Sequence, residues 1–123
     1  MHEVLFDDAF LKDTGVTTLD FAKALIDEGF HPMTMYFPLV VHGALLIEPT
    51  ETESKASLDQ FAAVLTGLAA RAQSIKTGAG DAASFREAPL LTPRRRLDET
   101  TAARKPVLRW KPQTTESHST ACP

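Results

Sequence analysis

The stretch from residue 29 to residue 58 reads Gly-Phe-His-Pro-Met-Thr-Met-Tyr-Phe-Pro-Leu-Val-Val-His-Gly-Ala-Leu-Leu-Ile-Glu-Pro-Thr-Glu-Thr-Glu-Ser-Lys-Ala-Ser-Leu. Its opening glycine is the residue type on which helices commonly end. Two short apolar runs, 34–37 and 44–47, are bounded by prolines and predict two strands, with a connection short enough for an irregular hairpin. Thr52 or Ser54 can then cap a helix. This stretch therefore predicts a helix end, a strand pair and a helix start.

The residues before this stretch predict one strand and one helix. Residues 2–7 contain the run Val-Leu-Phe followed by acids, which is typical of a short buried strand. Residues 19–29 follow a helical apolar period, with Thr17 or Thr18 as the N-cap and Asp20 near the positive end of the helix dipole. The apolar stripe of this helix consists of Leu19, Phe21, Ala22, Leu25 and Ile26.

A second helix is predicted after the strand pair, because apolar residues recur there at helical spacing and form one face. These residues are Leu58, Phe61, Ala62, Leu65, Leu68, Ala69 and Ala72. The helix is expected to cover the sheet and to end near Ser74. The predicted fold class is therefore α+β, a small antiparallel sheet covered by helices, with elements in the order β-α-β-β-α, in a domain that spans residues 1–75.

The charge of the chain is divided unevenly along its length. Residues 1–93 carry 6 Lys/Arg against 13 Asp/Glu, and residues 94–123 carry 7 against 3. Residues 76–112 predict an extended basic arm that packs on the domain or on a partner subunit, because opposite charges on one chain favour docking. Residues 113–123 are polar and predict a disordered tail.

The basic run could alternatively bind nucleic acid. Residues 94–96 are all arginine, and Trp110 could stack on a base. Asp98 and Glu99 interrupt the positive charge, however, and the acidic body offers a nearer partner. We therefore expect the arm to dock on the chain's own surface or on a sister subunit, and we expect no nucleic-acid partner.

Cysteine content and hydropathy exclude other classes of protein. Cys122 is the single cysteine, so the chain can form no internal disulfide, which fits a reducing compartment, and we expect a cytoplasmic protein. The first residues include acids where a secretory signal needs basic residues. No run approaches the roughly 18 apolar residues of a membrane helix, so no membrane association is expected.

Acids gather around the predicted start of the second helix, at Glu48, Glu51, Glu53 and Asp59. They allow a metal site or a pair of catalytic carboxylates. Acids near a helix start are also stabilised by the helix dipole, and no histidine at ligand spacing accompanies them. We therefore predict no metal site.

The histidines and the remaining nucleophiles form no recognisable catalytic motif. His31 and His42 lie eleven residues apart, which matches no zinc spacing. His31 either interacts with the end of the preceding helix or faces a functional cleft, while His2 and His118 are expected at the surface. The sequence contains no Gly-rich phosphate loop and no serine or cysteine nucleophile motif, so no catalytic residue is assigned.

Several long segments of the chain resemble one known family. They are Gly-Phe-His-Pro (29–32), Thr-Met-Tyr-Phe-Pro-Leu (34–39), Ile-Glu-Pro-Thr-Glu-Thr-Glu-Ser-Lys (47–55), Leu-Asp-Gln-Phe (58–61), Thr-Pro-Arg-Arg-Arg-Leu-Asp-Glu (92–99) and Ala-Ala-Arg-Lys-Pro-Val-Leu-Arg-Trp (102–110). Over about residues 2–112 the chain resembles the C-terminal region of the glycine cleavage system P-protein, the pyridoxal-phosphate-dependent glycine dehydrogenase (decarboxylating). Its tail resembles subunit 2 of the two-subunit form. Met33 stands where the family has the second proline of a His-Pro-Pro-Thr motif.

The resemblance implies the C-terminal small domain of the aspartate-aminotransferase-like fold. In the family, the lysine that binds pyridoxal 5'-phosphate lies upstream in a His-Lys pair, and no such pair occurs here. The resemblance therefore implies an internal start at Met1 and a fragment that binds no cofactor and has no activity alone. The implied partners are the remainder of subunit 2, subunit 1 and the lipoylated H-protein, with glycine as the substrate of the whole enzyme.

His31, Thr34 and Glu51 are expected at the rim of the active-site cleft, because loops at strand ends commonly present functional groups. A structural alternative is that Thr50 forms a turn, and that Glu51 and Glu53 favour the helix start. A different class of function is a free-standing interaction module that binds a partner through the basic arm.

Overall fold

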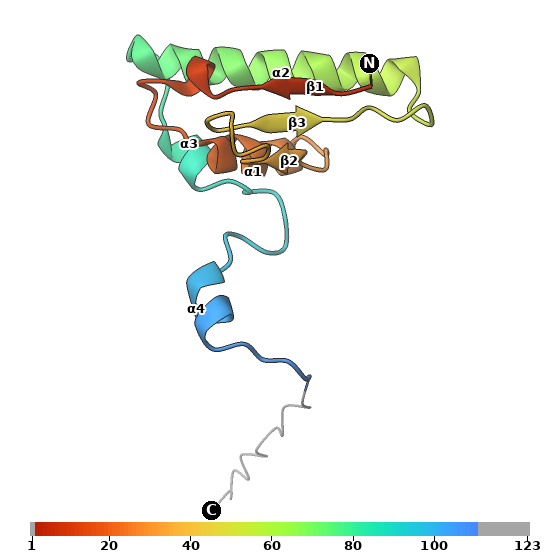
Figure 1. The fold of residues 1–123 in the computed structure, drawn as a ribbon. Coiled ribbons are helices and arrows are strands. Elements are labelled where there is room, and N and C mark those ends of the chain that lie inside the picture. The colour runs from red at the N-terminus through yellow and green to blue at the C-terminus, as the bar shows by residue number, and fades with distance from the viewer. Residues whose placement is uncertain (1, 111–123) are drawn as a thin grey trace, which may run out of the picture.

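The computed structural model describes residues 2–110 and shows a small sheet with helices packed against it, with the last helix, Glu99–Arg104, lying apart from this body (Figure 1). The elements are β1 (Val4–Phe6), a 3-10 helix (Ala9–Leu11), α1 (Thr18–Asp27), β2 (Thr34–Met35), β3 (Leu45–Ile47), α2 (Lys55–Lys76), α3 (Ala83–Arg86) and α4 (Glu99–Arg104). The predicted α+β class and the β-α-β-β-α order are confirmed.

The sheet has three antiparallel strands in the order β1-β3-β2. At its centre, Leu45 lies opposite Phe6 on one side and Met35 on the other. The predicted pairing of the strands now labelled β2 and β3 is confirmed. β2 ends at Met35 rather than at residue 37, because Tyr36 has a φ of 58°, a left-handed conformation that interrupts the strand.

The prediction that the first strand is buried is wrong. Val4, Leu5 and Phe6 are 46%, 44% and 45% exposed. β1 is an edge strand that pairs with β3 alone, whereas β3 has a neighbour on both sides and Leu45 is buried. An edge strand has a covered side and an open side, so its apolar residues lose only part of their contact with water.

α1 begins with a capping box. The Thr17 hydroxyl accepts a hydrogen bond from the Asp20 N–H at 3.1 Å, and the Asp20 carboxylate accepts one from the Thr17 N–H at 2.9 Å. Thr17 rather than Thr18 is therefore the N-cap, and Thr18 is buried, with its hydroxyl donating to the Gly43 carbonyl at 2.9 Å. The helix ends before Gly29, which has a φ of 84°.

α2 begins after Ser54, whose hydroxyl accepts the Ser57 N–H at 3.1 Å. It ends at Lys76, one half turn beyond the predicted end at Ser74. Its packed face also differs from the predicted one, because Ala62 is exposed while Val64 and Ile75 pack against the core. No helix within residues 2–110 has the length and apolar character needed to cross a membrane.

The hydrophobic core continues beyond residue 75. Ala82, Phe85 and Ala88 are buried in the same cluster as the residues of α1, β3 and α2. The Phe85 ring stacks on Phe21 at a centroid distance of 6.4 Å, and the Arg71 guanidinium lies 4.3 Å from the Phe85 ring centroid. The first part of the predicted arm is therefore part of the packed body.

Two aspartates of α1 hold the segment that follows. The Asp27 carboxylate accepts the backbone N–H groups of Leu90 and Leu91 at 2.7–2.8 Å. The Asp20 carboxylate accepts Arg96 Nη2 at 2.7 Å, and the same nitrogen donates to the Phe85 carbonyl at 3.1 Å. Residues 88–96 therefore lie along α1.

Candidate functional site

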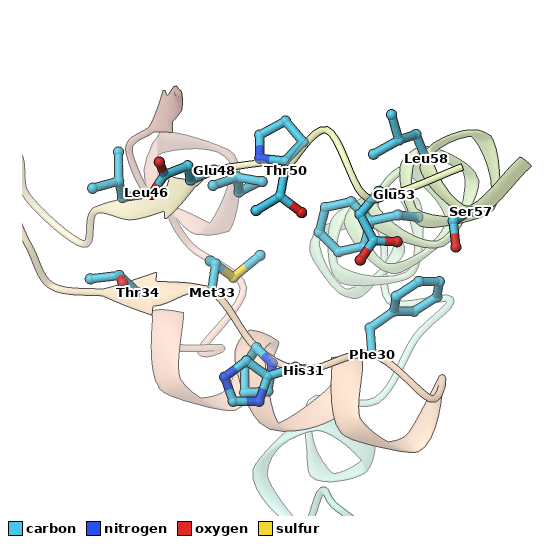
Figure 2. A pocket seen from close by; sticks show the side chains of 14 residues that line it. Phe30, His31, Met33, Thr34, Leu46, Glu48, Thr50, Glu53, Ser57 and Leu58 are labelled. Carbon is cyan, nitrogen blue, oxygen red and sulfur yellow. The ribbon is translucent and has the colours of Figure 1, made fainter. Parts of the chain in front are cut away.

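A cleft of about 530 Å³ lies where the end of α1, the start of β2, the end of β3 and the start of α2 meet. Figure 2 shows Phe30, His31 and Met33 on one side of it and Thr50, Glu53 and Ser57 on the other. Its full lining is Phe30, His31, Pro32, Met33, Thr34, Leu46, Ile47, Glu48, Pro49, Thr50, Glu53, Ser57, Leu58 and Phe61. A cleft of this size is in the usual range for ligand-binding sites.

Aromatic packing closes one end of the cleft. The rings of Phe30 and Phe61 lie 5.2 Å apart at 55°. Phe30 follows Gly29, and its backbone N–H donates to the Leu25 carbonyl at 3.0 Å, which completes the helix end and turns the chain toward α2. The end of α1 therefore positions one aromatic wall of the cleft.

The carboxylates of Glu48 and Glu53 are the charged side chains of the lining, which also contains His31. Glu48 follows β3, and Glu53 directly precedes the N-cap of α2. The Glu53 N–H donates to the Thr50 carbonyl at 3.1 Å, which forms the turn that leads Glu53 to the cleft. Within residues 2–110, no lysine or arginine lines the cleft. The arrangement suits a group with both apolar surface and positive charge.

The structure brings two of the three predicted rim residues together. His31 and Thr34 line the cleft, whereas Glu51 is exposed in the turn before α2 and does not. The sequence did not predict Glu48 and Glu53 as lining residues, because stabilisation by a helix dipole was favoured for these acids over a metal site or a pair of catalytic carboxylates. Glu53 could have been favoured over Glu51, since it stands immediately before a capping serine whose position fixes the turn.

The family assignment comes from comparison with known sequences. Residues 1–90 match the model of a protein family described as "Glycine dehydrogenase, C-terminal domain". The chain belongs to this family. It is 70% identical over 112 residues to the probable glycine dehydrogenase (decarboxylating) subunit 2 of Caulobacter vibrioides, which covers 91% of this chain and 20% of that relative. The resemblance found in the sequence is thereby confirmed.

Other relatives with the same description are more distant. The probable subunit 2 of Caldanaerobacter subterraneus is 52% identical over 110 residues, covering 89% of this chain and 21% of the relative. That of Desulforamulus reducens is 49% identical over 114 residues, covering 92% and 22%. The chain thus spans about one fifth of the length of these relatives.

One group of possible metal ligands lies beside the cleft of this glycine dehydrogenase C-terminal domain. His2, Glu3 and Glu48 place one ligand atom each within 4.8 Å of one another, with His2 Nε2 3.5 Å from Glu3 Oε1 and 4.0 Å from Glu48 Oε1. All three residues are exposed. Such a group is equally well explained as a surface ion pair, so the structure gives no reason to assign a metal to it.

His42 lies outside the cleft and pairs with Asp8. Its Nδ1 is 2.9 Å from both carboxylate oxygens of Asp8. The Asp8 carboxylate can lie against the backbone of Gly43 because glycine has no Cβ, and a Cβ at this position would collide with the Asp8 carboxyl carbon. Gly43 also has a φ of 57°, a conformation that favours glycine. The hydrogen bond and the charge of Asp8 raise the pKa of His42 above its ordinary value.

We expect an NMR titration to find the pKa of His42 above the ordinary value of a histidine, and an Asp8→Asn variant to lower it toward that value. Because the pKa is raised in the folded state, the stabilisation from this pair is complete below the unfolded-state pKa. It is lost as the pH rises through the folded-state pKa. An unchanged curve for His42 would show that the ion pair does not form in solution.

Proposed function

We propose that this chain acts as the C-terminal domain of subunit 2 of a pyridoxal-phosphate-dependent glycine dehydrogenase (decarboxylating). The observation that carries the proposal is the 70% identity over 112 residues to such a subunit. In the proposed enzyme, glycine loses its carboxylate as carbon dioxide, and the aminomethyl group passes to the lipoylated H-protein. The remainder of subunit 2 and subunit 1 are the partners that complete the enzyme.

The residues of the cleft do not by themselves fit pyridoxal phosphate. This cofactor needs a lysine for its aldehyde and donors or cations for its phosphate. The described lysines are Lys12, Lys23, Lys55, Lys76 and Lys105, and none of them lines the cleft. Glu48 and Glu53 would repel a phosphate. We therefore propose that the cofactor is held by the rest of the enzyme and that this chain alone has no activity.

What the chain would contribute is a wall of the active site, in the manner of the small domain of an aspartate-aminotransferase-like fold. His31 lies in the loop before β2 and Thr34 is the first residue of β2, across the cleft from its acidic side. In this proposal they orient the reacting groups, and Glu51 lies at the outer rim, where it contacts the neighbouring domain. The apolar residues around Phe61 exclude water from the end of the cleft where Phe61 packs on Phe30.

A chimeric enzyme tests the proposal. The matching segment of the Caulobacter vibrioides subunit 2 is replaced by this chain, and the chimera is assembled with subunit 1 and lipoylated H-protein. We expect release of carbon dioxide from glycine. In the chimera, His31→Ala should lower kcat/KM by about tenfold or more, because it removes a positioning contact. His42→Ala is the matched control, since His42 lies outside the cleft.

The outcomes of this test separate the two classes of function. A chimera that assembles but releases no carbon dioxide would contradict the proposal. In that case the free-standing interaction module becomes the better account, and the observation that favours it is that every residue from 97 to 110 is exposed. The isolated chain offers an independent measurement: absorbance titration should detect no stoichiometric binding of pyridoxal phosphate. Saturable binding at one lysine would overturn the assignment of the cofactor to the rest of the enzyme.

A further inference from the structure

Of the predicted arm (residues 76–112), residues 97–110 lie outside the packed body, and from here on the word arm means these residues alone. All of them are exposed. α4 lies in the arm and buries no residue. The apolar side chains that follow α4 are almost fully open to water, with Val107 and Leu108 88% exposed and Trp110 85% exposed. Three such residues within a short segment, interleaved with basic ones, are typical of a surface that another polypeptide covers.

The base of the arm is fixed to the body. Arg96 is held by the Asp20 carboxylate in the first turn of α1. The cleft begins at Phe30, beyond the last turn of α1, so the base of the arm and the cleft lie at opposite ends of this helix, about 15 Å apart. Figure 1 shows α4 leaving the body on the side away from α2. The arm is thus directed away from the cleft of its own chain.

The arm and the cleft are chemical complements. The arm presents Val107, Leu108 and Trp110 together with the cations Arg104, Lys105 and Arg109. The cleft presents the apolar side chains Phe30, Met33, Leu58 and Phe61 together with the carboxylates Glu48 and Glu53. The acidic body and basic C-terminal part of the chain give the same complementarity over a longer range.

We propose that two copies of this chain associate by placing the arm of each copy in the cleft of the other. Each copy offers one arm and one cleft, so a two-fold arrangement satisfies both contacts and closes. Once the first arm is seated, the second contact forms within the same pair and is favoured by its high effective concentration. Trp110 is the anchor that fills the apolar part of the cleft, since aromatic residues commonly dominate such contacts.

This inference does not depend on the proposed enzymatic function, because it concerns the chain alone. The two are related in one respect. In the proposed enzyme the same cleft faces the neighbouring domain, so a seated arm and that domain exclude each other. The self-associated pair would keep the apolar cleft covered until the rest of the enzyme displaces the arm.

Sedimentation velocity of the 123-residue chain over a concentration series, with the emission of its single tryptophan, tests the proposal. We expect a monomer–dimer equilibrium that weakens with added salt, because screening reduces attraction between exposed charges. The emission of Trp110 should shift to shorter wavelength as the dimer forms. A chain that stays monomeric at every concentration overturns the proposal. A blue-shifted emission that is independent of concentration also overturns it, because the arm is then seated in its own cleft.

A charge-swapped pair of variants identifies the contact. Glu48→Lys with Glu53→Lys should weaken the dimer at least tenfold, and Arg104→Glu with Arg109→Glu should do the same. Mixing the two variants should restore a heterodimer, because each holds the charges that the other has exchanged. Glu28→Lys with Glu87→Lys is the matched control, since it reverses two exposed acids that do not line the cleft. Equal weakening by this control, or no rescue on mixing, overturns the assignment of the cleft.

Discussion

A Phe85→Ala variant is expected to lose about 3–5 kcal/mol of the free energy of unfolding. The Phe85 side chain is fully buried, stacks on Phe21 and lies under the Arg71 guanidinium. Its removal leaves a cavity between α1, α2 and α3, in addition to the lost transfer of an aromatic ring from water. A small domain has only about 5–15 kcal/mol of stability in total, so the variant should be close to unfolding at 25 °C. Urea denaturation followed by circular dichroism measures the loss.

Two control variants separate the effect of the buried ring from the effect of removing any apolar side chain. Phe85→Leu nearly conserves volume and should cost less, about 1.5 kcal/mol or below. Leu91→Ala removes a side chain that is 80% exposed and should change stability by less than about 0.5 kcal/mol. If Phe85→Ala costs no more than Leu91→Ala, then α3 does not belong to the packed body, and the domain ends near residue 75 as the sequence alone suggested.

The parts of the fold that follow from local rules were predictable. The caps of α1 and α2 and the glycine end of α1 are set by residues next to each helix, so the sequence identified the glycine directly and limited each cap to two candidates. The exposure of β1 was not predictable, because a strand's burial depends on what covers it in space and not on its own residues. The burial of Phe85 was missed for a related reason. It lies in a helix of four residues, too short for an apolar period to appear.

The candidate site also has parts that the sequence predicted and parts that it did not. His31 and Thr34 were found because they follow a helix end and begin a strand, which places them at the edge of the sheet. Glu51 was chosen in place of Glu53 because the cap of α2 was left open between Thr52 and Ser54, and only the Ser54 cap places Glu53 directly before the helix. The cleft itself comes from the meeting of α1 with α2, and their aromatic residues Phe30 and Phe61 are far apart in the sequence. Only the three-dimensional packing brings them into contact.

An Arg96→Ala variant is expected to lose about 2–4 kcal/mol of stability. It breaks a half-buried ion pair and removes the side chain that donates hydrogen bonds to two backbone carbonyls. Arg96 joins the Asp20 carboxylate to the carbonyls of Phe85 and Ala88. The side chains of Arg96 and Asp20 are only 30% and 10% exposed. Arg96→Lys should recover less than half of the loss, because one ammonium group cannot reach all three acceptors in the geometry of a guanidinium. Arg95→Ala is the control, since the neighbouring arginine is exposed.

The pH dependence of stability distinguishes the charge of Asp20 from its packing. Burial raises the pKa of Asp20, but the hydrogen bonds from Thr17 and the Arg96 guanidinium outweigh burial and lower this pKa below its ordinary value. A lowered folded-state pKa stabilises the protein above the unfolded-state pKa of about 3.9, and this stabilisation is lost as the pH falls through the folded-state value. The wild-type chain should therefore lose stability as the pH falls below about 4, and Asp20→Asn should show a shallower loss over the same interval. Equal slopes for the two proteins would show that Asp20 holds the start of α1 and the base of the arm through its shape alone, without a contribution from its charge.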